Sequence, residues 1–366
     1  MVYILLILFT ALLVSISEKL ASRSVLLLSL VPYFLVASIQ SGVGTDYYNY
    51  LNIYTTSVDM DRFYQSNEFV FYFAIKLFQY FDFPGQSVFV FSAFVNTILF
   101  YFILRSLKRC GYTITIVFII FMLVTGIYQN QLNGIRNYSA ILSFILCFLL
   151  FFEKRYFSFA LVFIWGVFSH FSFLIVLPVF AFLVLSNGFL RRLWLIFLIS
   201  PVFYLFILPG FVENLVSYVF PKYAYLLASE SLEQKDFMDI LPKIILLPIY
   251  LLSVFSYSKS SSHLDYKGTL HYGMNIFVFS YFIFLTLTTF SVFSRPLQYF
   301  SFFYIFPIYY LVVRFNLISK KLSVFRYFLT IMLIISLAGP FIAKATFFKA
   351  NEYDYKTIIF SGEERS

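Results

Sequence analysis

Long apolar runs are the feature that most constrains how this chain can fold. The stretches 114–124 and 141–152 carry almost no polar side chains, and only 12% of the whole chain is charged, against about 25% in a soluble domain. In hydrocarbon every backbone polar group must be bonded within the structure, which leaves helices or closed barrels. A barrel would show alternating strands of roughly ten residues. The continuous runs therefore predict an all-α, polytopic integral membrane protein.

The apolar stretches predict about 12 transmembrane helices of roughly 20 residues each. Two neighbouring stretches, 156–169 and 171–186, are short and could form one long helix. We interpret them as two helices, because merging them would reverse the sidedness of all later spans. The expected spans are 2–16, 24–40, 87–105, 113–130, 134–152, 156–169, 171–186, 193–210, 241–257, 272–292, 296–314 and 324–343.

Basic residues indicate the orientation. The first span has no basic residue before it, so it is expected to be retained as a span and not cleaved as a signal peptide. Lys19 and Arg23 follow it and place the N-terminus outside. With alternating sides, the inner loops hold 15 of the 26 basic residues and 3 of the 17 acidic ones. The net charge of +9 therefore reflects membrane topology, and no nucleic-acid partner is expected.

Residues 1–366 are expected to form a single membrane domain with two large outer segments, 41–86 and 211–240. The first contains a short apolar piece, 69–81, that includes Lys76. Because it is too short to span, it predicts an interfacial or re-entrant helix.

A polar island, Asn133-Gly134-Ile135-Arg136, separates two apolar runs. A helix N-terminus offers unpaired N–H groups and a partial positive charge, and Gly134 permits close backbone approach. Arg136 in the first turn therefore suits a phosphate or diphosphate. The alternative is an arginine that snorkels to lipid headgroups. At the outer edge it is expected to carry little packing.

Further candidates lie on the same predicted face. Asp46 and Glu68 are carboxylates beside the membrane, and His170 lies between two apolar runs, so each could act as a general base. Tyr47 could stack on a sugar ring. Ordinary roles stay open: an interfacial aromatic belt, an acid at a helix start and a neutral polar cap.

Arg295 precedes Pro296, a residue that suits the first turn of a helix. Two arginines at two helix starts, Arg136 and Arg295, could clamp a diphosphate. No metal is expected, although Asp59-Met60-Asp61 matches an Asp-x-Asp pattern literally; we interpret that pair as part of a solvated loop.

A set of short motifs follows one another in order along the chain: Gly44-Thr45-Asp46-Tyr47, Glu68, Asn133-Gly134-Ile135-Arg136, His170 with Ser172 and Pro178, Arg295 with Tyr299 and Pro307, and Tyr355-Lys356. This ordered set resembles the EpsG family of Wzy-like exopolysaccharide and O-antigen polymerases. The resemblance covers nearly the whole chain, with departures at 69–70 and 137–139.

This resemblance implies a GT-C-like glycosyltransferase in the bacterial inner membrane that needs no cofactor. Its substrate would be an undecaprenyl-diphosphate-linked oligosaccharide in the lipid bilayer, and a chain-length regulator is a possible partner. Two other functions stay open. A flippase for lipid-linked sugars would favour repeated halves with midplane polar groups, and an O-antigen ligase would share the donor and the chemistry.

Overall fold

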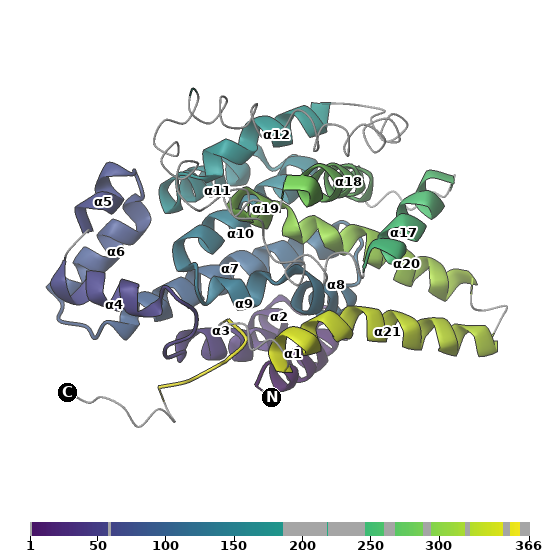
Figure 1. Cartoon of the computed structure of the whole chain (residues 1–366), viewed down its shortest axis with the longest axis horizontal. Coiled ribbons are helices and arrows are strands. Elements are labelled where there is room, and N and C mark those ends of the chain that lie inside the picture. Colours follow the sequence, from purple (N-terminus) through teal and green to yellow (C-terminus); the bar gives the residue numbers. More distant parts are fainter. Residues whose placement is uncertain are drawn as a thin grey trace. The chain divides into compact units, whose positions relative to one another are not determined.

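The computed structural model describes residues 2–57, 60–185, 218, 246–259, 268–287, 294–318, 323–346 and 352–358. Within these ranges all elements are helical, apart from one isolated antiparallel bridge between Gln40 and Thr357 (Figure 1). The chain divides into two compact units, 1–177 with 341–366, and 178–340. The expected all-α architecture with several apolar helices is confirmed. The single membrane domain stays a prediction.

In the described ranges three helices of the first unit are long and apolar enough to cross a membrane: α1 (Val2–Lys19), α7 (Gln86–Arg109) and α10 (Ile135–Phe152). Shorter helices complete this unit. They are α2 (Arg23–Ser29), α3 (Val31–Ser38), α4 (Tyr47–Thr56), α5 (Met60–Gln65), α6 (Phe69–Tyr80), α8 (Ile114–Ile120), α9 (Ile127–Gln131), α11 (Tyr156–Ser169) and the start of α12 (Phe173–Leu185).

Two expected spans are each broken into shorter helices. The stretch 24–40 forms α2 and α3, which meet at Leu30, with Pro32 in the first turn of α3. Proline lacks an N–H and its ring clashes with the preceding turn. The stretch 113–130 forms α8, a π-helical turn η1 (Phe121–Thr125) and α9. The break lies at Gly126, whose φ of +67° favours glycine, and Thr125 donates its hydroxyl to the carbonyl of Phe121.

The two helices expected at 156–169 and 171–186 are present as α11 and α12. Their junction is tight, because a Cβ on Gly166 would lie 2.6 Å from the ring of Phe173. His170 lies at this junction, in an extended conformation.

The second unit contains α17 (Leu247–Lys259), α18 (Thr269–Leu287), α19 (Ser294–Phe300), the 3-10 turn η6 (Ser301–Tyr304), α20 (Ile305–Ile318) and most of α21 (Ser323–Thr346). Tyr250 packs against Phe277, Tyr281 and Tyr304, with ring centroids 4.8–5.9 Å apart. These helices occupy parts of the expected spans 241–257, 272–292, 296–314 and 324–343. The expected span 193–210 and, apart from Tyr218, the outer segment 211–240 lie outside the described residues.

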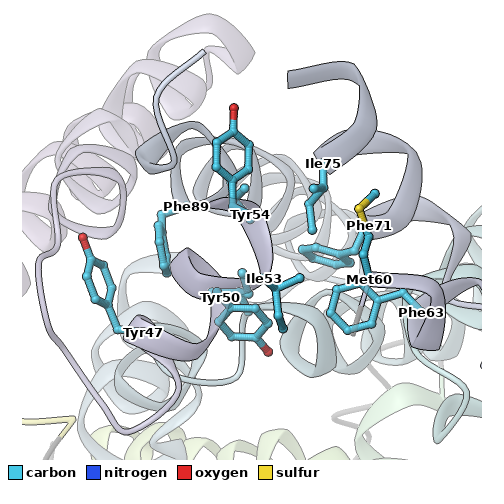
Figure 2. Packing of buried hydrophobic residues seen from close by; sticks show 11 residues of the cluster. Tyr47, Tyr50, Ile53, Tyr54, Met60, Phe63, Phe71, Ile75 and Phe89 are labelled. Atoms are coloured by element: carbon cyan, nitrogen blue, oxygen red, sulfur yellow. The ribbon is translucent and has the colours of Figure 1, made fainter. Parts of the chain in front are cut away.

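The outer segment 41–86 is folded into α4, α5 and α6, of which only α6 was expected. Buried aromatic and aliphatic side chains of these helices pack against α7 and the start of α10 (Figure 2). The cluster consists of Tyr47, Tyr50, Ile53, Tyr54, Met60, Phe63, Phe71, Ile75, Val88, Phe89 and Ile135. Packing of this aromatic cluster holds the turn between α5 and α6 beside the N-terminus of α10.

Candidate functional site

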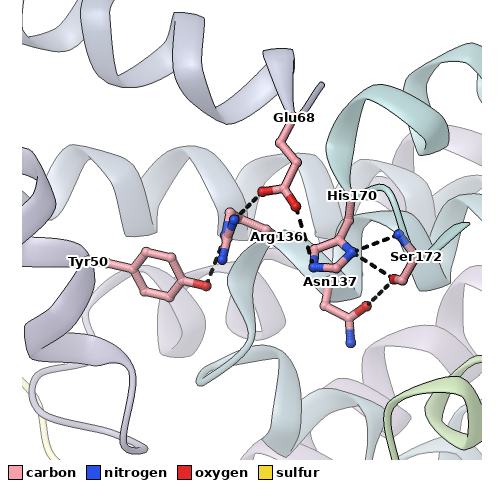
Figure 3. Close-up of polar contacts among 6 residues, drawn as sticks. All are labelled: Tyr50, Glu68, Arg136, Asn137, His170 and Ser172. Carbon is pink, nitrogen blue, oxygen red and sulfur yellow. Dashed lines mark hydrogen bonds and ion pairs between the residues drawn. The ribbon is translucent and has the colours of Figure 1, made fainter. Parts of the chain in front are cut away.

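Three side chains that lie far apart in the sequence meet in the first unit. Glu68 forms an ion pair with Nη1 of Arg136, and its other oxygen lies 3.6 Å from Nε2 of His170. Figure 3 shows Glu68 between the two, at the junction of α5–α6, α10 and α11–α12. The cluster brings together three of the residues selected from the sequence.

A helix-ending motif places Glu68. Asn67 has a φ of +60°, a left-handed conformation that asparagine tolerates better than most residues. The N–H of Glu68 donates to the carbonyl of Phe63 at 2.8 Å, and the N–H of Asn67 donates to Tyr64 at 3.0 Å. This pair of bonds is a Schellman motif that ends α5. Ser66 therefore belongs to the end of α5 and does not cap α6.

The carboxylate of Glu68 contacts Arg136 and His170 and does not cap the following helix, α6. It makes no capping bond to α6, and the residue is only 5% exposed. Burial raises the pKa of Glu68, while Arg136 and then Arg62 lower it in part, and the net direction is upward. A carboxylate with a raised pKa is a better proton acceptor near neutral pH.

Arg136 is held on several sides. Its Nε donates to the hydroxyl of Tyr50 at 3.3 Å, and its guanidinium lies 4.3 Å from the ring centre of Phe63. The expectation that an outer-edge arginine carries little packing is therefore wrong. Among the described residues no hydrogen bond uses Nη2 of Arg136, so this nitrogen can still donate to an anion.

The tautomer of His170 follows from its neighbours. The backbone N–H of Ser172 donates to Nδ1 of His170 at 3.1 Å, so Nδ1 is the acceptor and the proton of the neutral ring lies on Nε2. Nε2 is the ring nitrogen that lies toward Glu68 (Figure 3). The hydroxyl of Ser172 lies 2.7 Å from Nδ1 and 3.3 Å from Oδ1 of Asn137. This arrangement suits a ring that orients the carboxylate. A role of His170 as general base stays a prediction.

Asp46, Asn133 and Gly134 form a second polar group at the start of α10. Oδ1 of Asn133 accepts the backbone N–H of Asp46 at 2.8 Å. Gly44 makes this approach possible, because its φ is +79° and a Cβ there would lie 2.5 Å from Oδ1 of Asn133. At Gly134, the residue before α10, a Cβ would lie 3.3 Å from the ring of Tyr138. The motif after α3 thus holds the N-terminus of α10.

Tyr47 and Arg295 are the remaining residues selected from the sequence. The ring of Tyr47, expected to stack on a sugar, stacks instead on Phe89 with centroids 4.5 Å apart, and its hydroxyl donates to Gln86 at 3.0 Å. Burial raises the pKa of Tyr47. Arg295 lies in the first turn of α19, in the second unit, so the clamp with Arg136 stays a prediction.

The Asp-x-Asp pattern is only partly described. Asp61 is exposed in the first turn of α5, and Asp59 lies outside the described residues. In the described part of the chain no three His, Cys, Asp or Glu side chains are grouped to hold a metal ion. Metal independence stays a prediction.

Several residues of the site were not selected from the sequence. Tyr50 and Phe63 hold the guanidinium, and Arg62 acts electrostatically on Glu68. Tyrosine and phenylalanine number 30 and 53 in this chain, so abundance hides the two that matter here. Asn137 stood out only as a departure from the expected family pattern, and its contact with Ser172 gives that departure a role.

Comparison with known proteins gives one match at the family level. Neither the curated proteins nor the solved structures contain a match to this chain. The model of the EpsG family matches residues 23–357, which include Asp46, Glu68, Arg136, His170 and Arg295. This chain therefore belongs to the EpsG family.

Proposed function

We propose that this protein polymerises undecaprenyl-diphosphate-linked oligosaccharide repeat units into O-antigen, capsule or exopolysaccharide. In this proposal it is a GT-C-like membrane glycosyltransferase of about 12 spans, and its site faces the outside of the bacterial inner membrane. The observation that carries the proposal is the meeting of Glu68, Arg136 and His170 in a chain of the EpsG family.

The reaction assigns a distinct role to each side chain. Glu68 accepts the proton of the acceptor hydroxyl as its oxygen bonds to the anomeric carbon of the donor. The bond from that carbon to the lipid diphosphate breaks, and the diphosphate leaves with the electron pair. Arg136 and the N–H groups of the first turn of α10 stabilise the leaving anion.

His170 is a positioning residue in this scheme. Its Nε2 lies 3.6 Å from the carboxylate, and the backbone N–H of Ser172 bonds to the ring from the other side. Arg62, exposed on α5, supplies a second cation near the carboxylate. Asp46 and Asn133 hold the backbone before α10 in place through the hydrogen bond from the Asp46 N–H to Oδ1 of Asn133.

Purified full-length protein in liposomes with lipid-linked repeat units tests the proposal. Wild type should form ladders of increasing glycan length without added divalent metal. Arg136→Lys keeps the charge but loses the planar two-pronged contact, and should slow elongation on the order of a hundredfold. Loss of elongation on chelation, restored by magnesium or manganese, would contradict metal independence.

Arg109→Lys is the matched control, because Arg109 also pairs with a glutamate, Glu153, at 2.7 Å. The Arg109→Lys variant should elongate the glycan at the wild-type rate. Transfer of a single repeat unit to lipid A core, with no ladder, would identify a ligase. Movement of the lipid-linked unit across the bilayer without any new glycosidic bond would identify a flippase.

A further inference from the structure

An apolar cavity of about 660 Å³ lies between α6, α7 and α11. This volume falls within the range of about 300–1,000 Å³ typical of small-molecule sites. Its walls are aromatic and aliphatic, and the one lining residue with a polar side-chain atom is Trp165, whose Nε1 already donates to Ser139 at 3.2 Å. The walls therefore suit hydrocarbon and not a glycan.

Two lining residues of the cavity are close in sequence to residues of the candidate site. Phe69 directly follows Glu68, Phe168 lies two residues before His170, and these two rings lie 5.4 Å apart. From Phe69 the lining continues along α6 to Leu77, a distance of about 12 Å at 1.5 Å per residue. A molecule with a charged head at Arg136 can thus extend an apolar chain along α6.

The cavity also opens to the surface of the first unit. Phe73 and Leu77 on α6 are 60% and 53% exposed, and Leu161 on α11 is 55% exposed. An opening with apolar rims on both sides allows a lipid chain to enter sideways from a bilayer, with no polar barrier to cross.

We propose that this cavity binds the isoprenoid chain of the lipid diphosphate, at the isoprene units nearest the diphosphate, while the diphosphate lies at Arg136. The inference rests on the proposed function for the identity of the head group. It assigns α6 and the outer part of α11 to recognition of the lipid.

Photo-crosslinking tests the site directly and does not depend on turnover. The probe is farnesyl diphosphate with a diazirine on its last isoprene unit, added to full-length protein in phosphatidylglycerol liposomes. We expect labelled peptides from α6 and α11, and loss of labelling with excess unlabelled undecaprenyl diphosphate. Labelling elsewhere, or labelling that excess phospholipid removes equally well, would overturn the proposal.

A matched pair of variants supplies a second readout. Leu161→Ser places a hydroxyl in the cavity wall, whereas Leu5→Ser alters a residue of α1 with the same 55% exposure. The first should raise the donor KM and weaken crosslinking on the order of tenfold, the equivalent of 1.4 kcal/mol; the second should change neither. Equal effects from both variants would overturn the proposal.

The two proposals fail in distinguishable ways. Crosslinking in the cavity without any glycan elongation would retain the lipid site and reject the polymerase. Elongation with unchanged KM in Leu161→Ser and no label on α6 or α11 would retain the polymerase and reject the lipid site.

Discussion

Removing Glu68 and removing Arg136 should change the unfolding free energy by different amounts. Glu68 has a side chain only 6% exposed, against 23% for Arg136. Burial raises the pKa of Glu68 despite the nearby cations, so the charged carboxylate is less stable in the protein than in water. Glu68→Gln should therefore lie within about 1 kcal/mol of wild type in unfolding free energy.

Arg136→Met should be far more harmful, because it leaves a buried carboxylate without its cation. Breaking a buried pair from one side costs about 3–5 kcal/mol, and the partial exposure of Arg136 sets the expectation near about 2–3 kcal/mol. In Glu68→Gln/Arg136→Met the charge penalty disappears, and only the loss of the contact with Phe63 remains, about 0.5–1 kcal/mol.

The sign of the pH dependence follows from the same reasoning. Of the two cations that lower the pKa of Glu68, Arg136 has the larger effect, so its loss raises that pKa further. Stability tied to the neutral carboxyl is present at low pH and is lost as pH rises through that raised pKa. The deficit of Arg136→Met should thus shrink on acidification, and the double variant should show no such recovery.

The assay is unfolding in mixed micelles with increasing SDS, followed by intrinsic fluorescence, for wild type, both single variants and the double variant. A coupling energy of about 1–3 kcal/mol is expected for groups in direct contact. If the two single effects add within about 0.5 kcal/mol, the ion pair contributes nothing and the account of Glu68 is wrong.

Other variants test individual parts of the site. Asn67→Gly should retain stability and activity, whereas Asn67→Val should lose about 1–3 kcal/mol in unfolding free energy because valine resists a positive φ. His170→Gln should retain much of the activity that His170→Ala loses, since glutamine can donate from a position like Nε2; equal loss would indicate proton transfer by the ring. The rate of elongation should fall as pH drops through the raised pKa of Glu68, and a rate that rises on acidification would exclude Glu68 as the base. An impermeant thiol reagent should label Tyr48→Cys but not Lys154→Cys in intact cells, and the reverse result would invert the topology.

The helical membrane architecture could be predicted because hydrocarbon permits so few alternatives. The breaks at Leu30 and Gly126 could not. At Leu30 the apolar run continues through the break, and Gly126 lies inside the expected span 113–130, so hydropathy does not locate either break. The cause is local: a proline in the next turn and a glycine with positive φ. Hydropathy identifies the stretch that is buried in apolar surroundings, whereas backbone chemistry decides where the helix ends.

The site shows a similar division. Glu68, Arg136 and His170 were each identifiable as polar residues at the edge of an apolar run. Their mutual contact was not, because it depends on the helices α4 and α5, and on the aromatic cluster that packs them against α7. The partners of Arg136 are a tyrosine and a phenylalanine, residue types too common in this chain for their positions to carry information.

Contacts within the first unit give an argument for sidedness that is independent of charge counting. Arg136 lies at the start of α10 and Glu153 directly follows its end, about 26 Å away at 1.5 Å per residue, close to the hydrocarbon thickness of about 30 Å. Residues expected outside contact one another, and so do residues expected inside. The outer contacts are Asp46–Asn133, Glu68–Arg136 and Ser41–Lys356, and the inner ones are Glu18–Thr115 and Arg109–Glu153. If the number of spans between two contacting residues were wrong by an odd number, the two residues would be expected on opposite sides of the membrane and could not touch. The contacts indicate which ends of the first unit's helices share a side. The excess of basic residues then predicts that the side of Glu153 faces the cytoplasm and that of Arg136 the outside.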